Sequence, residues 1–176
     1  LNISIAGFVT WRTKIFGVLL CGIFSSIYVV RHTSLAEEQG KRELLGANVT
    51  GSLAPLSAAL LNMIIINAAA MVFSVVCMAT LGLGFAGSLA HCLGISMAAC
   101  LVGVVAGVLA QLFESAYAAR GVSLGFLGIL FFLHILWNMS GGSNRVAYLN
   151  PVEWPLLIRP FAGEQFAVLW IGLGMG

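Results

Sequence analysis

Five residues in the apolar part of the sequence could line a path for a small molecule. They are Asn62 and Asn67 in one long apolar run, and Phe131, His134 and Asn138 in another. Polar side chains are costly inside a bilayer, so they mark candidate transport sites. Asn62 and Asn67 are separated by about 140° around a helix, so they cannot both face one narrow cavity. His134 and Asn138 have i, i+4 spacing and share a helix face.

Each of these residues also has a purely structural interpretation. The two asparagines could form hydrogen bonds between helices. His134 could be a packed, hydrogen-bonded histidine, and an aromatic side chain such as Phe131 could face lipid or a neighbouring helix. His91 lies near the start of a further apolar run and is interpreted as a residue of the membrane interface. The sequence alone leaves these alternatives open.

Covalent chemistry has no recognisable site in the sequence. It contains no G-x-x-x-x-G-K-[ST] phosphate-binding loop, no nucleophile elbow, no H-E-x-x-H and no Asp. We therefore expect no catalytic residues, no bound cofactor and no metal site in this chain. The cysteines Cys21, Cys77, Cys92 and Cys100 stand in apolar runs without metal-ligand spacing, and we expect them to be buried as small hydrophobic residues.

The stretch Arg31–Gly51 could bind a soluble partner. It carries six of the fourteen charged residues of the chain and lies between two apolar runs. Ser34 and Glu37 form a capping box, which predicts a short helix from Leu35 to Leu45. Acidic residues precede basic ones at i, i+4, which stabilises such a helix. The residues predicted to contact the partner are Glu37, Glu38, Lys41, Arg42, Glu43, Leu44 and Leu45. The alternative is a solvated loop helix.

The composition places these residues in a membrane protein. The chain of 176 residues is 60% hydrophobic and 8% charged, and its mean hydropathy is +1.04. A soluble domain carries roughly a quarter charged residues. The apolar runs are continuous rather than alternating, which favours helices over a transmembrane β-barrel. We therefore predict an all-α, polytopic bundle of transmembrane helices.

About five spans are expected from the lengths of the apolar runs. Residues 1–14 form an interfacial lead-in, in which Trp11-Arg12-Thr13-Lys14 is interpreted as a membrane-interface anchor. The remaining segments are a span at 15–30, a charged loop at 31–51, a hairpin of two spans at 52–113, a turn at 114–121, a span at 122–138, an interfacial or re-entrant loop at 139–164 and the start of a last span at 165–176.

Two further features bear on packing and orientation. Gly103 and Gly107 form a G-x-x-x-G pattern that suits close helix packing, although this pattern is common by chance. Basic residues are divided equally between the two faces, so they do not fix the orientation. The chain begins without Met and stops inside an apolar run, and we expect a fragment of a larger protein.

Three motifs resemble a known family. Val30–Thr33, Glu37–Leu45 and Ala47–Val49 resemble the R-x-E-E-x-G-R-x-E-L-L-x-A-x-P-V signature of bacterial ABC exporter permeases. The subgroup is that of polyketide-antibiotic (tetronasin-type) exporters with ABC-2-like membrane subunits. Leu149–Trp154 and Arg159–Glu164 resemble its L-S-P-x-x-W…R-P-[FY]-A-G-[DE] element, and Leu112–Ser115 resembles its L-F-P-S turn. The sequence departs from the family pattern at Lys41, Asn48 and Glu114.

The resemblance implies a function and a set of partners. The full permease would have about twelve spans in two halves, lie in the bacterial plasma membrane, and export hydrophobic antibiotics and other drugs. The charged helix would be a cytoplasmic coupling helix seated in an ABC ATP-binding subunit, which is itself a dimer and binds ATP and Mg²⁺. This would place the coupling-helix loop at 31–51 and the turn at 114–121 in the cytoplasm, and the lead-in at 1–14 and the loop at 139–164 outside. The other partners would be the second permease half and the bilayer, with no nucleic acid.

Two other functions are compatible with the sequence. One is half of a proton-coupled secondary transporter, with His134 or His91 in the proton relay. Such relays usually need a carboxylate within a span, and every Glu lies outside the predicted span cores. The other is a membrane scaffold that transports nothing.

Overall fold

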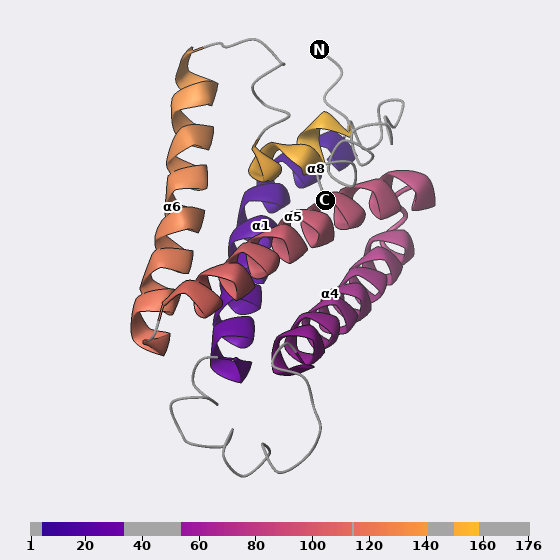
Figure 1. Cartoon of the computed structure of the whole chain (residues 1–176). Helices are drawn as coiled ribbons and strands as arrows, with labels where there is room; N and C mark the ends of the chain where they lie inside the picture. Colours follow the sequence, from indigo (N-terminus) through magenta and orange to yellow (C-terminus); the bar gives the residue numbers. More distant parts are fainter. Residues whose placement is uncertain (1–4, 34–53, 114, 141–149, 159–176) are drawn as a thin grey trace.

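Four long helices make up most of the fold in a computed structural model that describes residues 5–33, 54–113, 115–140 and 150–158 (Figure 1). The helices are α1 (Ile5–His32), α4 (Ala54–Thr80), α5 (Phe85–Leu112) and α6 (Ala116–Ser140), followed by the 3-10 helix η1 (Pro151–Glu153) and the short helix α8 (Trp154–Leu157). Within the described ranges there is no strand. All four long helices are long and apolar enough to cross a membrane, which confirms the predicted polytopic helical bundle.

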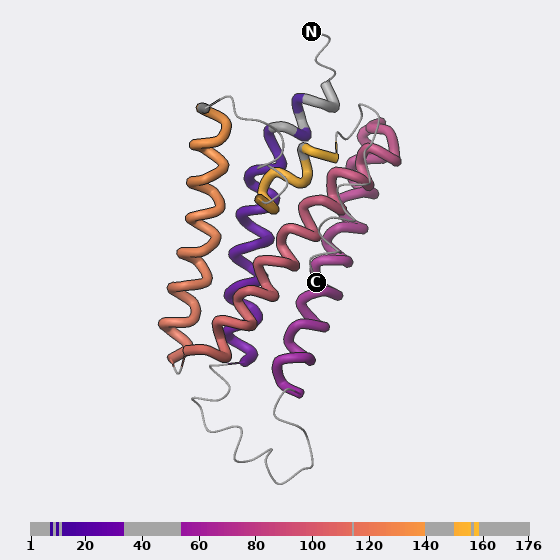
Figure 2. Tube along the Cα trace, turned by 45° about the horizontal axis from the view of Figure 1, so that its top comes forward, coloured from indigo at the N-terminus to yellow at the C-terminus, as the bar shows by residue number. Residues whose placement is uncertain are grey.

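Helix α5 is the centre of the bundle. It contacts α1, α4, α6, η1 and α8. In both views α1 and α5 lie between α4 on one side and α6 on the other (Figures 1 and 2). Successive long helices run in opposite directions, so α1 ends near the starts of α4 and α6. The segment η1–α8 lies at the opposite end of the bundle, beside the first half of α1.

Small residues on α5 allow this close packing. Its buried positions are mostly glycine, alanine and serine: Gly87, Ser88, Ala90, Gly94, Ala98, Ala99, Gly103, Ala106, Gly107 and Ala110. A Cβ atom added at Gly94 would lie 2.9 Å from the Cα of Pro155, and one at Gly103 would lie 2.7 Å from the Cε of Met63. A Cβ atom added at Gly107 would likewise meet Leu56 on α4. Gly103 and Gly107, the two glycines predicted to allow close packing, therefore do lie against a neighbouring helix.

The first helix differs from the expectation at its N-terminal end. It begins at Ile5 and continues without a break through Lys14 into the apolar run. Arg12 is exposed, but Lys14 is buried, so the interpretation of Lys14 as an interface anchor is wrong. The physical reason is a carboxylate from η1 that reaches the Lys14 ammonium group, as described below.

Further predictions concern the cysteines, the start of the fourth long helix and two segments that the structure does not describe. Cys92 is buried, but Cys77 is exposed on α4, so the expectation of four buried cysteines is wrong there. The fourth long helix begins at Ala116, ahead of the predicted Val122. The predicted docking helix within 34–53 and the last span from 165 lie outside the described residues.

The contact at Gly94 gives a testable prediction about packing. Gly94→Ala should lower the unfolding stability by about 1–3 kcal/mol, because the added methyl group meets the Pro155 backbone, which cannot rotate away. The measurement is thermal unfolding of the purified full-length protein in detergent. The matched control is Gly128→Ala on α6, where nothing lies within 4 Å of the added Cβ. The control should be neutral or stabilising by up to about 1 kcal/mol. Equal effects of the two substitutions would contradict the packing argument.

Candidate functional site

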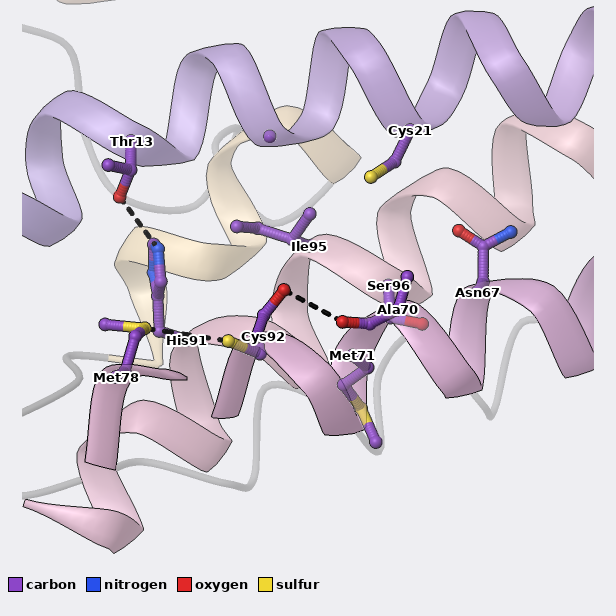
Figure 3. A pocket seen from close by; sticks show the side chains of 12 residues that line it. Thr13, Cys21, Asn67, Ala70, Met71, Met78, His91, Cys92, Ile95 and Ser96 are labelled. Carbon is purple, nitrogen blue, oxygen red and sulfur yellow. Dashed lines mark hydrogen bonds between the residues drawn. The ribbon is translucent and has the colours of Figure 1, made fainter. Parts of the chain in front are cut away.

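A cavity of about 270 Å³ lies between α1, α4 and α5 (Figure 3). Its size is close to the lower limit of typical small-molecule pockets. The lining residues come from all three helices: Thr13, Gly17, Cys21, Asn67, Ala70, Met71, Ser74, Met78, His91, Cys92, Ile95 and Ser96. None of these described lining residues is Asp, Glu, Lys or Arg. The cavity is therefore mostly apolar, with a few polar groups at defined places.

One end of the cavity carries a hydrogen-bonded pair. The Nε2 atom of His91 lies 3.1 Å from the hydroxyl oxygen of Thr13 (Figure 3). His91 is only 2% exposed. Its Nδ1 atom has no hydrogen-bond partner among the described residues. Because this atom has almost no accessible surface, the polar group that this end offers to the cavity is the Thr13 hydroxyl.

The opposite end carries Asn67. Its amide nitrogen donates hydrogen bonds of 3.0 Å to the hydroxyl of Ser25 on α1 and of 3.0 Å to the carbonyl of Met63. In Figure 3 the side-chain oxygen of Asn67 is turned toward the other lining residues, and the nitrogen is turned away from them. The two bonds thus fix the amide so that it presents an acceptor to the cavity.

Four of the lining residues carry sulfur atoms. Cys21 comes from α1, Met71 and Met78 from α4, and Cys92 from α5. The Cys92 thiol lies 3.7 Å from the Met78 sulfur. Among the residues that the structure describes, no group of three or more His, Cys, Asp or Glu could hold a metal ion. The sulfur atoms are therefore best explained as polarisable, adaptable contact surface.

A second polar cluster lies outside the cavity and joins α1, α6 and η1. The Lys14 ammonium group donates to Oε2 of Glu153 at 3.3 Å. The other carboxylate oxygen is hydrogen-bonded to Nδ1 of His134. The amide of Asn138 donates to the carbonyl of His134 at 2.8 Å and lies 3.4 Å from Glu153 Oε1. We call Lys14, His134, Asn138 and Glu153 the charge cluster.

Local sequence explains why Glu153 reaches this position. The side-chain oxygen of Asn150 accepts a 3.1 Å hydrogen bond from the backbone N–H of Val152 and so caps η1, while Pro151 fits the first turn. The amide nitrogen of Asn150 also donates a 3.0 Å bond to the carbonyl of Leu130 on α6. The start of η1 is therefore fixed to α6, and Glu153 points into the bundle.

The charge cluster holds Glu153 in its ionised form. Burial alone would raise the pKa of the Glu153 carboxyl. The hydrogen bond with His134 and the charge of Lys14 outweigh burial, and they hold this pKa below its ordinary value of 4.5. Because one buried carboxylate satisfies the buried Lys14 and also binds His134, the cluster depends on Glu153 more than on any other member.

The predicted path residues are divided between the two sites. Asn67 lines the cavity, whereas Asn62 is exposed on α4, in agreement with their predicted separation. His134 and Asn138 belong to the charge cluster, and Phe131 lies beside them with its ring 5.7 Å from that of His134. His91 is buried in the cavity wall. The residues predicted to contact an ATPase, Glu37 to Leu45, lie outside the described residues.

Sequence analysis missed several of these residues. Lys14 follows the first turns of a long apolar helix, and a lysine at such a place needs a buried partner. That signal could have suggested Glu153, which is the acidic residue between two prolines near Trp154. No sequence signal distinguishes Thr13 from other threonines. It lies beside Lys14, and the two neighbouring residues serve the cavity and the charge cluster respectively.

Almost the whole chain is similar to part of a known protein. No protein-family model matches the chain. Over 172 residues, 98% of its length, the chain is 31% identical to a multidrug efflux system permease protein of Mycobacterium tuberculosis. The chain spans 31% of the length of that protein. This similarity and the four membrane-length apolar helices show a multi-pass bacterial membrane protein.

The charge cluster predicts which of two substitutions destabilises the protein more. Glu153→Gln should lower stability by about 3 kcal/mol, because it leaves Lys14 buried without a counter-charge. Lys14→Met should cost less, because Glu153 keeps His134 as a partner. The pH dependence has a defined sign. A carboxyl whose pKa is lowered in the folded state contributes stability at neutral pH that is lost as pH falls through the folded pKa.

The measurement is the thermal unfolding temperature of the full-length protein in detergent between neutral and acidic pH. Wild type should lose stability below the ordinary carboxyl range more steeply than Glu153→Gln. A larger cost for Lys14→Met than for Glu153→Gln, or parallel pH curves for wild type and Glu153→Gln, would show that Glu153 does not hold the cluster together.

Proposed function

We propose that this chain is part of the transmembrane permease of an ABC-type exporter that moves hydrophobic drugs out across the membrane. The carrying observation is the 31% identity over nearly the whole chain to a multidrug efflux system permease protein. The apolar, uncharged cavity between three spans supports the same function, since such a cavity suits lipophilic molecules. The chain itself would be a non-catalytic transport subunit.

Energy would come from a separate ATPase subunit. The segment 34–53 connects α1 to α4, and these two helices form two of the three walls of the cavity. An ATP-driven displacement of this segment would therefore move α1 and α4 relative to α5 and change the cavity. In this proposal ATP and Mg²⁺ bind only to the partner, and Glu37, Glu38, Lys41, Arg42, Glu43, Leu44 and Leu45 form the contact.

The finer assignment to polyketide-antibiotic exporters of the tetronasin type belongs to the same proposal. It depends on the motif resemblance around residues 31–51 and 149–164. The second permease half and a dimeric ATPase would complete the transporter. The orientation that follows places residues 114–120 on the same cytoplasmic side as residues 31–51. The adjoining ends of α1, α4, α5 and α6 lie together at one end of the bundle, as this requires (Figure 1).

A proton-coupled secondary transporter is the second candidate, because one observation favours it. Such a transporter usually needs a carboxylate within the membrane, and the predicted span cores contain none. The structure nevertheless buries Glu153 against His134 on α6, which creates a carboxylate–histidine pair inside the bundle. The Lys14 ammonium group on the same carboxylate opposes a relay role, because it keeps the carboxylate ionised rather than ready to exchange protons.

Transport energetics separate the two candidates. Inside-out vesicles containing the full-length permease and its ATPase should accumulate an apolar dye such as Nile red when ATP is added. Vanadate, which inhibits ABC ATPases, should abolish the accumulation, whereas a protonophore should leave it unchanged within about twofold. Loss of accumulation with the protonophore but not with vanadate would establish the proton-coupled alternative. No accumulation under any condition would favour the non-transporting scaffold.

The coupling segment gives an independent prediction. A full-length variant with Glu37, Glu38, Lys41 and Arg42 reversed in charge should capture at least tenfold less ATPase in a pull-down, because complementary charges set partner choice and association. The control is Arg12→Glu, which reverses an exposed charge at the opposite end of α1. Equal capture by wild type and by the variant with four reversed charges would show that residues 31–51 do not form the coupling contact.

A further inference from the structure

We propose that the cavity between α1, α4 and α5 binds an uncharged, elongated aromatic molecule that carries a hydrogen-bonding group at each end. This inference rests on the proposed function, since it names the class of drug that the permease would recognise. It goes further by assigning the recognition to His91 and Thr13 at one end, to Asn67 at the other, and to sulfur atoms between them.

The charge selectivity follows from the lining residues. None of the described residues that line the cavity is Asp, Glu, Lys or Arg. The nearby charges of Lys14 and Glu153 are bonded to each other and do not line the cavity. A charged ligand would therefore lose its hydration without gaining a counter-charge, and this cost excludes it.

The aromatic preference follows from the sulfur-rich wall. Cys21, Met71, Met78 and Cys92 contribute side chains from all three helices, so a ligand between them would be surrounded by polarisable sulfur. Thioether sulfur makes favourable contacts with the edges and faces of aromatic rings. The cavity contains no lining Phe, Tyr or Trp of its own among the described residues, so the aromatic partner in such contacts would be the ligand.

The two polar ends set the length and the end groups. Figure 3 shows His91 and Thr13 at one side of the cavity and Asn67 at the other. The hydroxyl of Thr13 lines the cavity 3.1 Å from His91 Nε2, and a hydroxyl can both donate and accept. The Asn67 oxygen is an acceptor. A hydroxyl group at each end of the ligand satisfies both sites, because a hydroxyl both donates and accepts.

Three matched probes test this with the wild-type full-length permease in detergent. The first is biphenyl with one hydroxyl at each end, the second is unsubstituted biphenyl, and the third is biphenyl with a carboxylate at each end. Binding is measured with the tritiated diol and by displacement. The diol should bind at least about tenfold more tightly than biphenyl, because each net hydrogen bond increases the affinity about three- to tenfold. The dicarboxylate should not displace it. Displacement by the dicarboxylate at equal concentration would overturn the inference.

Variants locate the binding. His91→Phe, which removes the hydrogen-bond partner of the Thr13 hydroxyl, and Asn67→Leu should each reduce the advantage of the diol over biphenyl by about three- to tenfold. Asn62→Leu, an exposed position on the same helix as Asn67, is the matched control and should leave the ratio unchanged. Unfolding temperatures show whether each variant is folded. If loss of the Ser25 contact destabilises Asn67→Leu, the His91→Phe variant alone tests the inference. Unchanged ratios in a folded His91→Phe variant would overturn the inference.

Failure of this inference differs from failure of the proposed function. ATP-dependent accumulation of the diol in vesicles tests the function, and the binding ratios test the cavity. Accumulation that His91→Phe and Asn67→Leu leave unchanged would overturn the cavity assignment and retain the exporter. Binding with the expected ratios but without vanadate-sensitive accumulation would retain the cavity and overturn the exporter.

Discussion

The close approach of other elements to the small-residue surface of α5 is the constraint on which the structure depends. Helices α1 and α4 and the segment 150–158 all pack on α5, and glycines lie where they come nearest. In a bilayer, helices gain little from the hydrophobic effect when they associate, so dispersion contacts and interhelical hydrogen bonds hold them together. The hydrogen bond from Asn67 to Ser25 adds to this packing by joining α4 to α1.

Helix α1 separates two polar environments with different chemistry. Thr13 contributes to an uncharged cavity, and the adjacent Lys14 contributes to a charge cluster. A buried ion pair is tolerated only when both charges are well satisfied. Glu153 meets this requirement through Lys14, His134 and Asn138 together. The arrangement keeps charge away from the cavity while fixing the segment 150–158 against the end of the bundle.

The helical class and most spans could be predicted from sequence because they follow from local hydrophobicity and length. The separation of Asn62 from Asn67, and the shared face of His134 and Asn138, followed from helix periodicity alone. The partner of Lys14 could not be predicted this way, since Glu153 is 139 residues away along the chain. The cavity could not be predicted either, because Thr13, Asn67 and His91 come to line one cavity only through the packing of three helices on one another.

The position of the cavity between helices explains how binding and motion could be coupled. Two of its walls, α1 and α4, are adjacent in sequence through residues 34–53, and the third wall is the central α5. A ligand that contacts all three walls favours the arrangement in which they lie close, so any process that separates α1 and α4 from α5 must overcome that binding energy. By reciprocity, a partner that separates these helices weakens binding. In the proposed function, a partner bound to residues 34–53 would release the ligand in this way.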